Sequence, residues 1–141
     1  MIPLLQIGPY APSVEEALGK VHEVHRWWEL SDPDAFLAEQ GPRIRAVATD
    51  GGRGLSRAVM DRLPALEVIS VFGVGVDAVD LEEARRRGIA VGNTPDVLTG
   101  DVADLAVAML LALCRRLPEA EAWARSGDWP GSRAGRRSSP S

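Results

Sequence analysis

The residues with the clearest potential for chemistry lie in the loop 73–77, which has the sequence G-V-G-V-D. The loop follows the apolar run Val68–Phe72, which predicts a strand buried on both faces. Glycine opens the backbone to a ligand, and successive free N–H groups form a concavity that suits an anion. We therefore take the N–H groups of Val74 and Gly75 as a candidate cradle for a carboxylate or phosphate. A tight turn between strand and helix explains the spacing equally well.

The same loop partly matches the dinucleotide fingerprint G-x-G-x-x-G, but two features argue against that interpretation. Ala78 stands where the third glycine belongs. No acidic residue ends the next predicted strand to bind a ribose, because the nearest polar residue there is Asn93. We therefore do not expect this loop to hold a dinucleotide.

Two further loops carry polar groups at predicted strand ends. In the glycine-rich loop 50–54, Arg53 could pair with an anionic substrate, although a solvated arginine in a flexible turn is the favoured alternative. In the stretch 93–99, Thr99 could bind a ligand at the start of a long helix, but a role as helix cap would also explain it.

Other reactive side chains give weaker signals. His22 and His25 have no acidic or cysteine partner at metal-ligand spacing, so we expect surface or half-buried roles and no metal site. Cys114 lies in an apolar helical stretch, which predicts an inert buried thiol. The tryptophans are not interleaved with basic residues, so a nucleic-acid stacking platform is not expected.

These loops need a scaffold, and the sequence predicts one of alternating strands and helices. Strands are expected at 2–7, 24–28, 43–49, 68–72 and 89–92. Helices are expected at 12–22, 31–41, 56–64, 81–87 and from Thr99 or Asp101 to about 124, with a bend at Pro118. The expected N-caps are Ser13, Ser31, Ser56 and Asp80, and Gly88 is the expected C′ residue. Such a series predicts an α/β fold with a parallel sheet and helices on both faces.

Composition limits the class of protein. The 141 residues are 45% hydrophobic, which suits one globular domain, and the net charge of −4 argues against a dedicated nucleic-acid binder. A single cysteine excludes an internal disulfide, and the longest apolar run, Val102–Cys114, is too short to span a membrane. The N-terminus has no basic region typical of a signal peptide. A cytoplasmic protein is therefore expected.

The end of the sequence differs from the rest. Residues 131–141 read GSRAGRRSSPS, with three arginines and no acid. Residues 1–130 consequently hold 16 − 3 = 13 basic and 20 acidic residues, a net charge of −7. Since the segment has no large apolar residue, we expect 125–141 to be a disordered tail.

Taken in order, these loops resemble the D-isomer-specific 2-hydroxyacid dehydrogenases, and within them the glyoxylate/hydroxypyruvate reductases. The resemblance rests on the G-V-G-V-D loop, the stretch NTPDVLT at 93–99 and the V-A-D-L helix at 102–105. The upstream run 49–67, TDGGRGLSRAVMDRLPALE, also fits. The resemblance covers about residues 1–129. Asp104 stands where the family usually has glutamate.

The resemblance implies the substrate-binding lobe of an NAD- or NADP-dependent oxidoreductase, with a flavodoxin-like sheet over residues 1–98. The enzymes of this family pass a hydride between the nicotinamide and a 2-keto or 2-hydroxy acid. Carried over, the N–H groups of Val74 and Gly75 would hold the substrate carboxylate, and Thr99 would lie near the nicotinamide. The helix 99–124 would link the two lobes and contribute to a dimer contact.

The family pattern also contains a Rossmann lobe with G-x-G-x-x-G, a catalytic arginine and a histidine acid, and none of these follows in this sequence. We therefore expect a truncated member with a non-native tail, inactive alone, which a frameshift or premature stop would explain. The alternative is a non-catalytic carboxylate-binding or dimerisation module, since the helix after Thr99 is apolar almost all round. A receiver-like signalling domain is disfavoured, because Gly8, Pro9 and Tyr10 stand where it needs acids.

Overall fold

The structure is a computed structural model that describes residues 1–126 of the chain. By its internal contacts the chain divides into two units, Met1–Asp96 and Val97–Ser141. The tail predicted for 125–141 lies outside the described residues from 127 onward.

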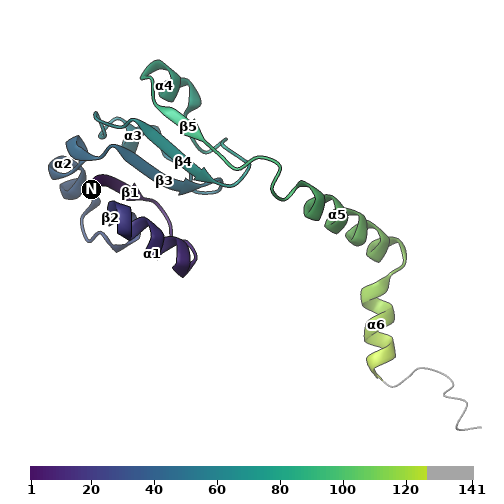
Figure 1. Ribbon diagram of the computed structural model, residues 1–141. Coiled ribbons are helices and arrows are strands. Elements are labelled where there is room, and N and C mark those ends of the chain that lie inside the picture. The colour runs from purple at the N-terminus through teal and green to yellow at the C-terminus, as the bar shows by residue number, and fades with distance from the viewer. Residues whose placement is uncertain (127–141) are drawn as a thin grey trace, which may run out of the picture. The chain divides into compact units, whose positions relative to one another are not determined.

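The first unit is built on a five-stranded sheet in the order β2-β1-β3-β4-β5 (Figure 1). The strands are β1 (Ile2–Gln6), β2 (His22–Arg26), β3 (Ala46–Asp50), β4 (Val68–Phe72) and β5 (Ala90–Gly92). Every neighbouring pair is parallel, with Leu4 opposite Ala46 and Ala46 opposite Val68. This order is the flavodoxin-like one, so the predicted α/β class and parallel sheet are confirmed.

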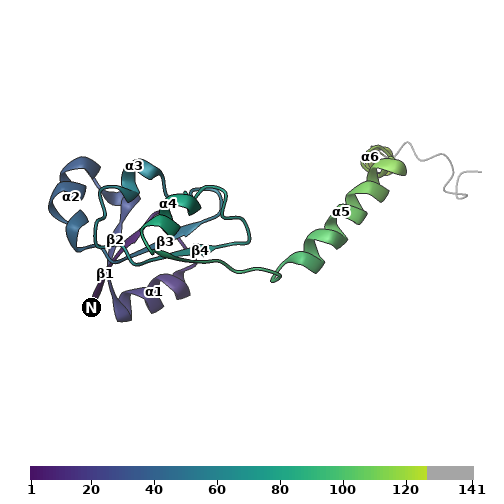
Figure 2. The same cartoon turned by 90° about the horizontal axis from the view of Figure 1, so that it is seen from above.

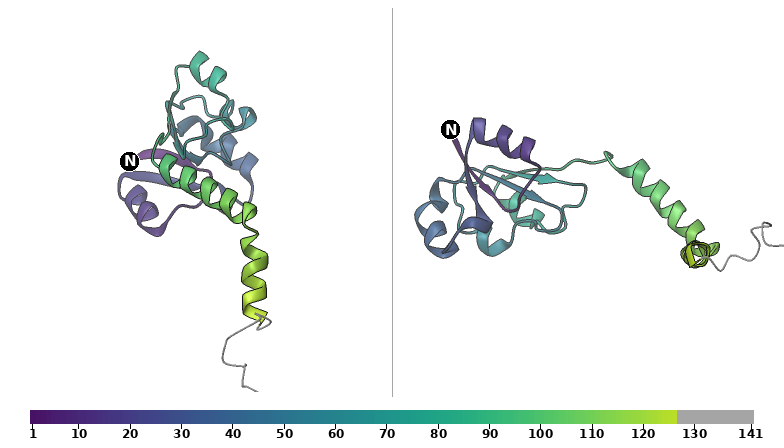
Figure 3. Two further views of the ribbon diagram at one scale, coloured as in Figure 1. Left: turned by 90° about the vertical axis from the view of Figure 1, so that its right-hand side faces the viewer. Right: turned by 90° about the horizontal axis from the view of Figure 1, so that it is seen from below.

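The helices of this unit divide between the two faces of the sheet. Helix α1 (Pro12–Val21) lies on one face, and α2 (Pro33–Glu39), α3 (Arg57–Met60) and α4 (Leu81–Arg86) lie on the other (Figures 2 and 3). Short 3₁₀ turns follow β2 (Trp27–Glu29) and α2 (Gly41–Arg43). The three-helix face carries the larger core cluster, in which Leu37, Met60 and Leu63 pack with Leu5, Val47 and Ile69.

The face covered by α1 is much less filled. Its buried cluster holds only Leu4, Ala46 and Ala48, with Tyr10, Leu18 and Val24 packed against it. Strand β4 therefore alternates, with Ile69 and Val71 buried but Val68 40% and Phe72 67% exposed. The prediction that this strand is buried on both faces was wrong, because no helix of the described residues 1–96 covers β4 on the α1 side.

The N-caps of the helices agree with the predicted capping residues in two cases and differ in two. Ser56 accepts a hydrogen bond from Val59 N, and Asp80 accepts one from Glu83 N, as predicted. The cap predicted at Ser31 is instead Asp32, whose carboxylate accepts from Ala35 N at 3.0 Å. The cap predicted at Ser13 is also wrong, because α1 already begins at Pro12. Proline suits the first position of a helix, since a backbone N–H there would have no partner within the helix.

The second unit contains α5 (Thr99–Cys114) and α6 (Leu117–Ser126). The single helix predicted to about 124 is thus two helices, separated at Arg115 and Arg116, and Arg116 has a left-handed φ of 52°. Pro118 falls in the first turn of α6, where its missing N–H costs nothing. Thr99 is the first residue of α5 and provides no side-chain cap.

None of the residues in α5 and α6 is buried, although α5 is rich in valine, leucine and methionine. Cys114 is exposed, so the prediction of a buried thiol was wrong. No helix within residues 1–126 combines the length and apolar character needed to cross a membrane.

Candidate functional site

The carboxyl ends of the parallel strands bring several loops to one edge of the sheet. In open α/β sheets ligands bind at this edge, because the connections diverge there and leave a crevice. The loops after β3 and β4 contain the predicted residues Arg53, Val74 and Gly75, and the segment after β1 contributes Pro9 and Tyr10.

The loop after β4 is held by the segment after β5. Gly73 N donates to Thr94 Oγ1 at 3.1 Å, and Thr94 N donates to the Gly73 carbonyl oxygen at 2.9 Å. Asn93 Nδ2 donates to the Val74 carbonyl oxygen at 2.8 Å. The N–H groups of Val74 and Gly75 donate to no group within residues 1–126, and both residues are exposed. Two successive donors on a fixed loop are therefore free to bind an anion.

The loop after β3 packs closely against the same turn. A Cβ on Gly51 would lie 2.8 Å from the Gly75 carbonyl oxygen, so this approach requires glycine. Leu55 N donates to the Ala78 carbonyl oxygen at 3.0 Å, and Leu55 pairs with Val79 in an isolated β-bridge. These contacts fix the position of the turn that carries Val74 and Gly75.

Arg53 lies in this neighbouring loop but is already engaged. Asp50 Oδ1 accepts hydrogen bonds from Gly52 N and Arg53 N, both at 2.9 Å, and Asp50 Oδ2 pairs with the Arg53 guanidinium. The Arg53 backbone N–H, followed by its side chain, lowers the pKa of Asp50. The Arg53 side chain lies over Gly8 and stays half exposed, so one side of the guanidinium still faces solvent.

Tyr10 and Glu15 fix the segment that follows β1. Glu15 Oε1 accepts from Tyr10 N at 2.8 Å and from Gln6 Nε2, and Arg26 pairs with Glu15 Oε2 at 3.4 Å. The Tyr10 N–H makes the largest contribution to lowering the pKa of Glu15. The Tyr10 hydroxyl donates to the Thr49 carbonyl oxygen at 2.7 Å, and burial with nearby Asp50 raises its pKa to about 12.

Sequence reasoning missed both of these residues. The signal was available for Tyr10, because it follows the end of a predicted strand at the ligand-binding edge. Glu15 gave only the ordinary signal of an acid in the first turn of a helix, which suits the helix dipole without any further role.

The remaining candidates are placed as follows. Thr99 belongs to the second unit, where it is exposed at the start of α5. His22 and His25 are half-buried on β2, and the His25 ring packs against Phe36 at 5.1 Å. Within residues 1–126 no group of three His, Cys, Asp or Glu side chains could hold a metal ion.

The glycine loop does not fit a dinucleotide. The Ala78 carbonyl oxygen already accepts from Leu55 N, and Gly54 packs so tightly against Ala78 that a Cβ there would be 2.0 Å from this oxygen. The turn leads into α4, a helix of only six residues that begins at Leu81.

Comparison with known proteins identifies the family of this chain. Residues 4–132 match the D-isomer specific 2-hydroxyacid dehydrogenase, catalytic domain. The chain belongs to this family. It is 44% identical over 131 residues to a 2-ketogluconate reductase of Gluconobacter oxydans, covering 93% of this chain and 41% of the relative. It is 41% identical to a hydroxyphenylpyruvate reductase of Plectranthus scutellarioides, over 91% of this chain and 41% of the relative.

Solved structures of the family show the same fold. A 2-hydroxyacid dehydrogenase from Ketogulonicigenium vulgare is 54% identical with a TM-score of 0.85, covering 99% of this chain and 42% of that one. An NADPH-dependent glyoxylate/hydroxypyruvate reductase from Sinorhizobium meliloti, in complex with NADP and malonate, is 41% identical with a TM-score of 0.75, covering 90% of this chain and 39% of that one. Family members are thus NAD(P)-dependent oxidoreductases, and the chain spans about two fifths of their length.

Proposed function

We propose that residues 1–98 form the substrate-binding domain of an NAD(P)-dependent oxidoreductase. Such an oxidoreductase reduces 2-keto acids of the glyoxylate and hydroxypyruvate type to D-2-hydroxy acids. The single observation that carries this proposal is the pair of unpaired N–H groups at Val74 and Gly75. Such donors bind a carboxylate with charge-assisted hydrogen bonds, which are about twice as strong as neutral ones.

The relatives support this substrate class. Those named above are a 2-ketogluconate reductase, a hydroxyphenylpyruvate reductase and a glyoxylate/hydroxypyruvate reductase that binds malonate. The acids that these names give, 2-ketogluconate, hydroxyphenylpyruvate, glyoxylate and hydroxypyruvate, each carry a carboxylate next to the carbon that is reduced. A site built from backbone donors suits this shared group, because it does not depend on the rest of the substrate.

Two side chains complete the proposal. Arg53 supplies a second contact to the anion from the solvent-facing side of its guanidinium, while Asp50 holds the other side. Thr99 contacts the nicotinamide cofactor at the start of α5. We also propose a cytoplasmic location, because a chain with a single cysteine suits a reducing compartment.

This chain by itself binds the carboxylate but does not transfer hydride. Hydride transfer requires a positioned nicotinamide and a proton donor within hydrogen-bond reach. The 141 residues contain no G-x-G-x-x-G motif and no histidine after His25. The NADH- or NADPH-dependent reduction of glyoxylate and hydroxypyruvate by the purified chain, followed by absorbance, is expected to equal the background rate. Turnover above background would overturn this part of the proposal.

Binding is tested separately from turnover. The ¹⁵N-labelled chain is titrated with oxamate, an unreactive analogue of a 2-keto acid, and its amide resonances are followed by NMR. We expect saturable shifts that are largest at Val74 and Gly75, with smaller shifts at Arg53. Shifts confined to other surfaces, or none at high oxamate concentration, would contradict a carboxylate cradle in this loop.

A second function, dimerisation through 99–124, is favoured by one observation. Leu105, Leu110 and Leu113 of α5 are each at least 60% exposed, an unusual state for large aliphatic side chains on one helix. We propose that this helix mediates homo-oligomer formation. Light scattering after gel filtration is expected to give more than the mass of one chain, and Leu110→Glu to lower it. A monomer at all concentrations would exclude this function.

A further inference from the structure

The segment after β5 makes three hydrogen bonds to the loop that carries the proposed carboxylate cradle, the N–H groups of Val74 and Gly75. Thr94 N donates to the Gly73 carbonyl oxygen at 2.9 Å, and Thr94 Oγ1 accepts from Gly73 N at 3.1 Å. Asn93 Nδ2 donates to the Val74 carbonyl oxygen at 2.8 Å. Asn93 and Thr94 lie beyond the end of β5, and the proposed function gives neither of them a role.

The two bonds that end on a carbonyl oxygen also set the direction of an N–H group. A peptide unit is planar, and in the trans form its carbonyl and the N–H of the next residue point in opposite directions. No peptide bond within residues 1–126 is cis. The bond to the Gly73 carbonyl therefore orients the Val74 N–H, and the bond to the Val74 carbonyl orients the Gly75 N–H. Both donors of the cradle are thus held from the opposite side of their own peptide units.

The loop needs such bonds because glycine stands on both sides of Val74. Glycine adopts positive and negative φ about equally readily, and Gly73 has a φ of +143°. Without the two bonds, the peptide units on either side of Val74 are free to rotate and to turn their N–H groups away from a common ligand. Within residues 1–126, the Val74 carbonyl accepts a hydrogen bond from no group other than Asn93 Nδ2. The direction of the Gly75 N–H consequently depends on this one side chain.

Thr94 also limits the number of free donors in the loop. Its Oγ1 accepts from Gly73 N, so only two of the three successive N–H groups at 73–75 remain for an anion. The next residue, Pro95, disfavours helical backbone at Thr94, which suits this reciprocal contact with Gly73. The two remaining donors match the two oxygen atoms of one carboxylate.

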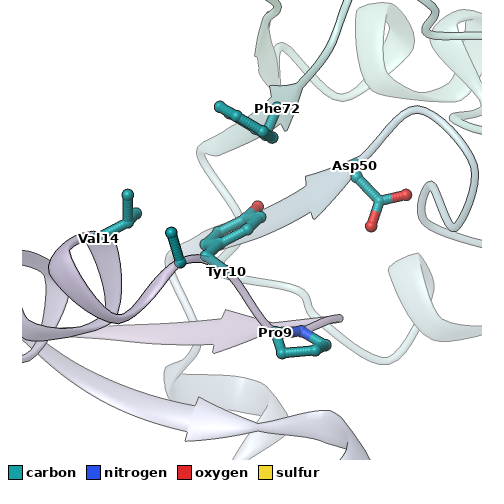
Figure 4. A pocket seen from close by; sticks show the side chains of 6 residues that line it. Pro9, Tyr10, Val14, Asp50 and Phe72 are labelled. Atoms are coloured by element: carbon teal, nitrogen blue, oxygen red, sulfur yellow. The ribbon is translucent and has the colours of Figure 1, made fainter.

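The pocket on the face that α1 covers does not enclose the cradle. Figure 4 shows this pocket, which is lined by Pro9, Tyr10, Ala11, Val14, Asp50 and Phe72. Neither Val74 nor Gly75 is among its residues, and both are exposed. Hydrogen bonds weaken steeply when donor and acceptor are misaligned. The affinity of the cradle therefore depends on the direction of its two N–H groups.

We infer that Asn93 is a positioning residue that orients the Gly75 N–H toward the substrate carboxylate, while Thr94 orients the Val74 N–H. Asn93 acts from the far side of the peptide unit and does not touch the substrate. The part of this inference that concerns affinity rests on the proposed function. The part that concerns orientation does not, since the bond from Asn93 to Val74 is made within the chain.

The test removes the donor in Asn93→Leu, which keeps a branched side chain of similar size. In the full ¹⁵N-labelled chain, NMR relaxation gives the order parameter of the Gly75 N–H, and titration with oxamate gives the affinity. We expect the order parameter to fall from about 0.85, typical of rigid backbone, to about 0.6. Oxamate is expected to bind about fivefold more weakly. The order parameter of the Val74 N–H is expected to change less, because Thr94 still holds it.

Two further variants complete the test. Gln40→Leu is the matched control, because the Gln40 amide bonds to Glu39 and Arg43 and not to the loop 73–77. It is expected to change neither the order parameter nor the affinity. Asn93→Asp keeps the shape of asparagine without the donor, and its charge would itself repel oxamate. It is therefore measured by the Gly75 order parameter alone, which is expected to fall as in Asn93→Leu. Circular dichroism checks that each variant is folded.

The outcomes separate the inference from the proposed function. If oxamate binds the unchanged chain and Asn93→Leu equally well, the inference is overturned and the cradle remains. An unchanged order parameter of the Gly75 N–H in both Asn93 variants would also overturn it. If oxamate does not bind the unchanged chain, the cradle is refuted, and the role of Asn93 in binding is refuted with it.

Discussion

The strands of the first unit and helix α5 of the second have similar aliphatic compositions but opposite environments. Leu5, Val47 and Ile69 are at most 1% exposed, because three helices lie over that face of the sheet. Leu105, Leu110 and Leu113 of α5 are at least 60% exposed. The difference shows that an apolar sequence favours burial, but that burial occurs only where other elements of the fold pack against it.

Strand β4 shows both situations within five residues. Ile69 and Val71 point into the three-helix core, whereas Val68 and Phe72 lie on the open face. The buried positions hold the sheet together and so position the loop that starts at Gly73. The exposed positions line a hollow on the face that α1 covers.

The largest expected effect comes from truncating one leucine in each environment. Leu63 has no exposed surface, so Leu63→Ala should lower the free energy of unfolding by about 3 kcal/mol. At concentrations where the chain is monomeric, Leu110→Ala, at a residue 60% exposed, should change it by less than about 0.5 kcal/mol. Urea denaturation followed by circular dichroism measures both. Similar losses in the two variants would mean that α5 is as well packed as the core.

A smaller effect separates two glycines of the first unit. Gly54 has a φ of +60°, and its Cβ would collide with the Ala78 carbonyl, so Gly54→Ala should destabilise the fold by about 2 kcal/mol. Gly19 lies in α1 with open space around it, so Gly19→Ala should stabilise by about 0.5 to 1 kcal/mol. Thermal unfolding of the two variants checks the opposite signs. Stabilisation by Gly54→Ala would contradict the close contact between the loops 50–55 and 75–79.

The smallest effect concerns pH and compares one carboxylate in each unit. The folded-state pKa of Glu15 is lowered, so its contribution is present above the unfolded pKa of about 4.3 and is lost as pH falls through the folded value. Glu15→Gln should therefore remove part of the acid sensitivity of stability, by less than about 1 kcal/mol. Glu121, in an exposed pair with Arg125 on α6, provides the control. An equal effect of Glu121→Gln on unfolding between pH 3 and 6 would argue against a specific role of Glu15.

The sequence predicted all five strands and most helices because each is marked by local signals. Runs such as Val68–Phe72 are apolar, and caps such as Ser56 and Asp80 act within four residues. The loop with Val74 and Gly75 was selected as a candidate for the same reason. Helix boundaries were predicted wrongly where two candidate caps are neighbours. Ser31 and Asp32 could each cap the next helix, and the sequence does not show that Asp32 is the residue that does so.

What the sequence could not predict depends on contacts between distant segments. The pairing of Tyr10 with Thr49 and with Phe72 joins residues 39 and 62 positions apart, and no periodicity reports such contacts. The exposure of Phe72 and Cys114 was not predicted either, because the sequence does not show which face of a strand or helix lacks a packing partner. The ion pair between Arg53 and Asp50 joins residues close in sequence, but it was not predicted. In a glycine-rich loop, an arginine that pairs with a neighbouring acid cannot be told from one that binds a substrate.

The central claim is that backbone donors at the end of β4 bind a carboxylate, and two substitutions at one residue test it most directly. Gly75→Pro removes the N–H, whereas Gly75→Ala keeps it, and the added Cβ meets only Asp77 at 3.9 Å. We expect Gly75→Pro to weaken oxamate binding about tenfold or more and Gly75→Ala to bind as the unchanged chain does. Equal affinity of the proline and alanine variants would show that the carboxylate does not depend on this donor, and would contradict the account.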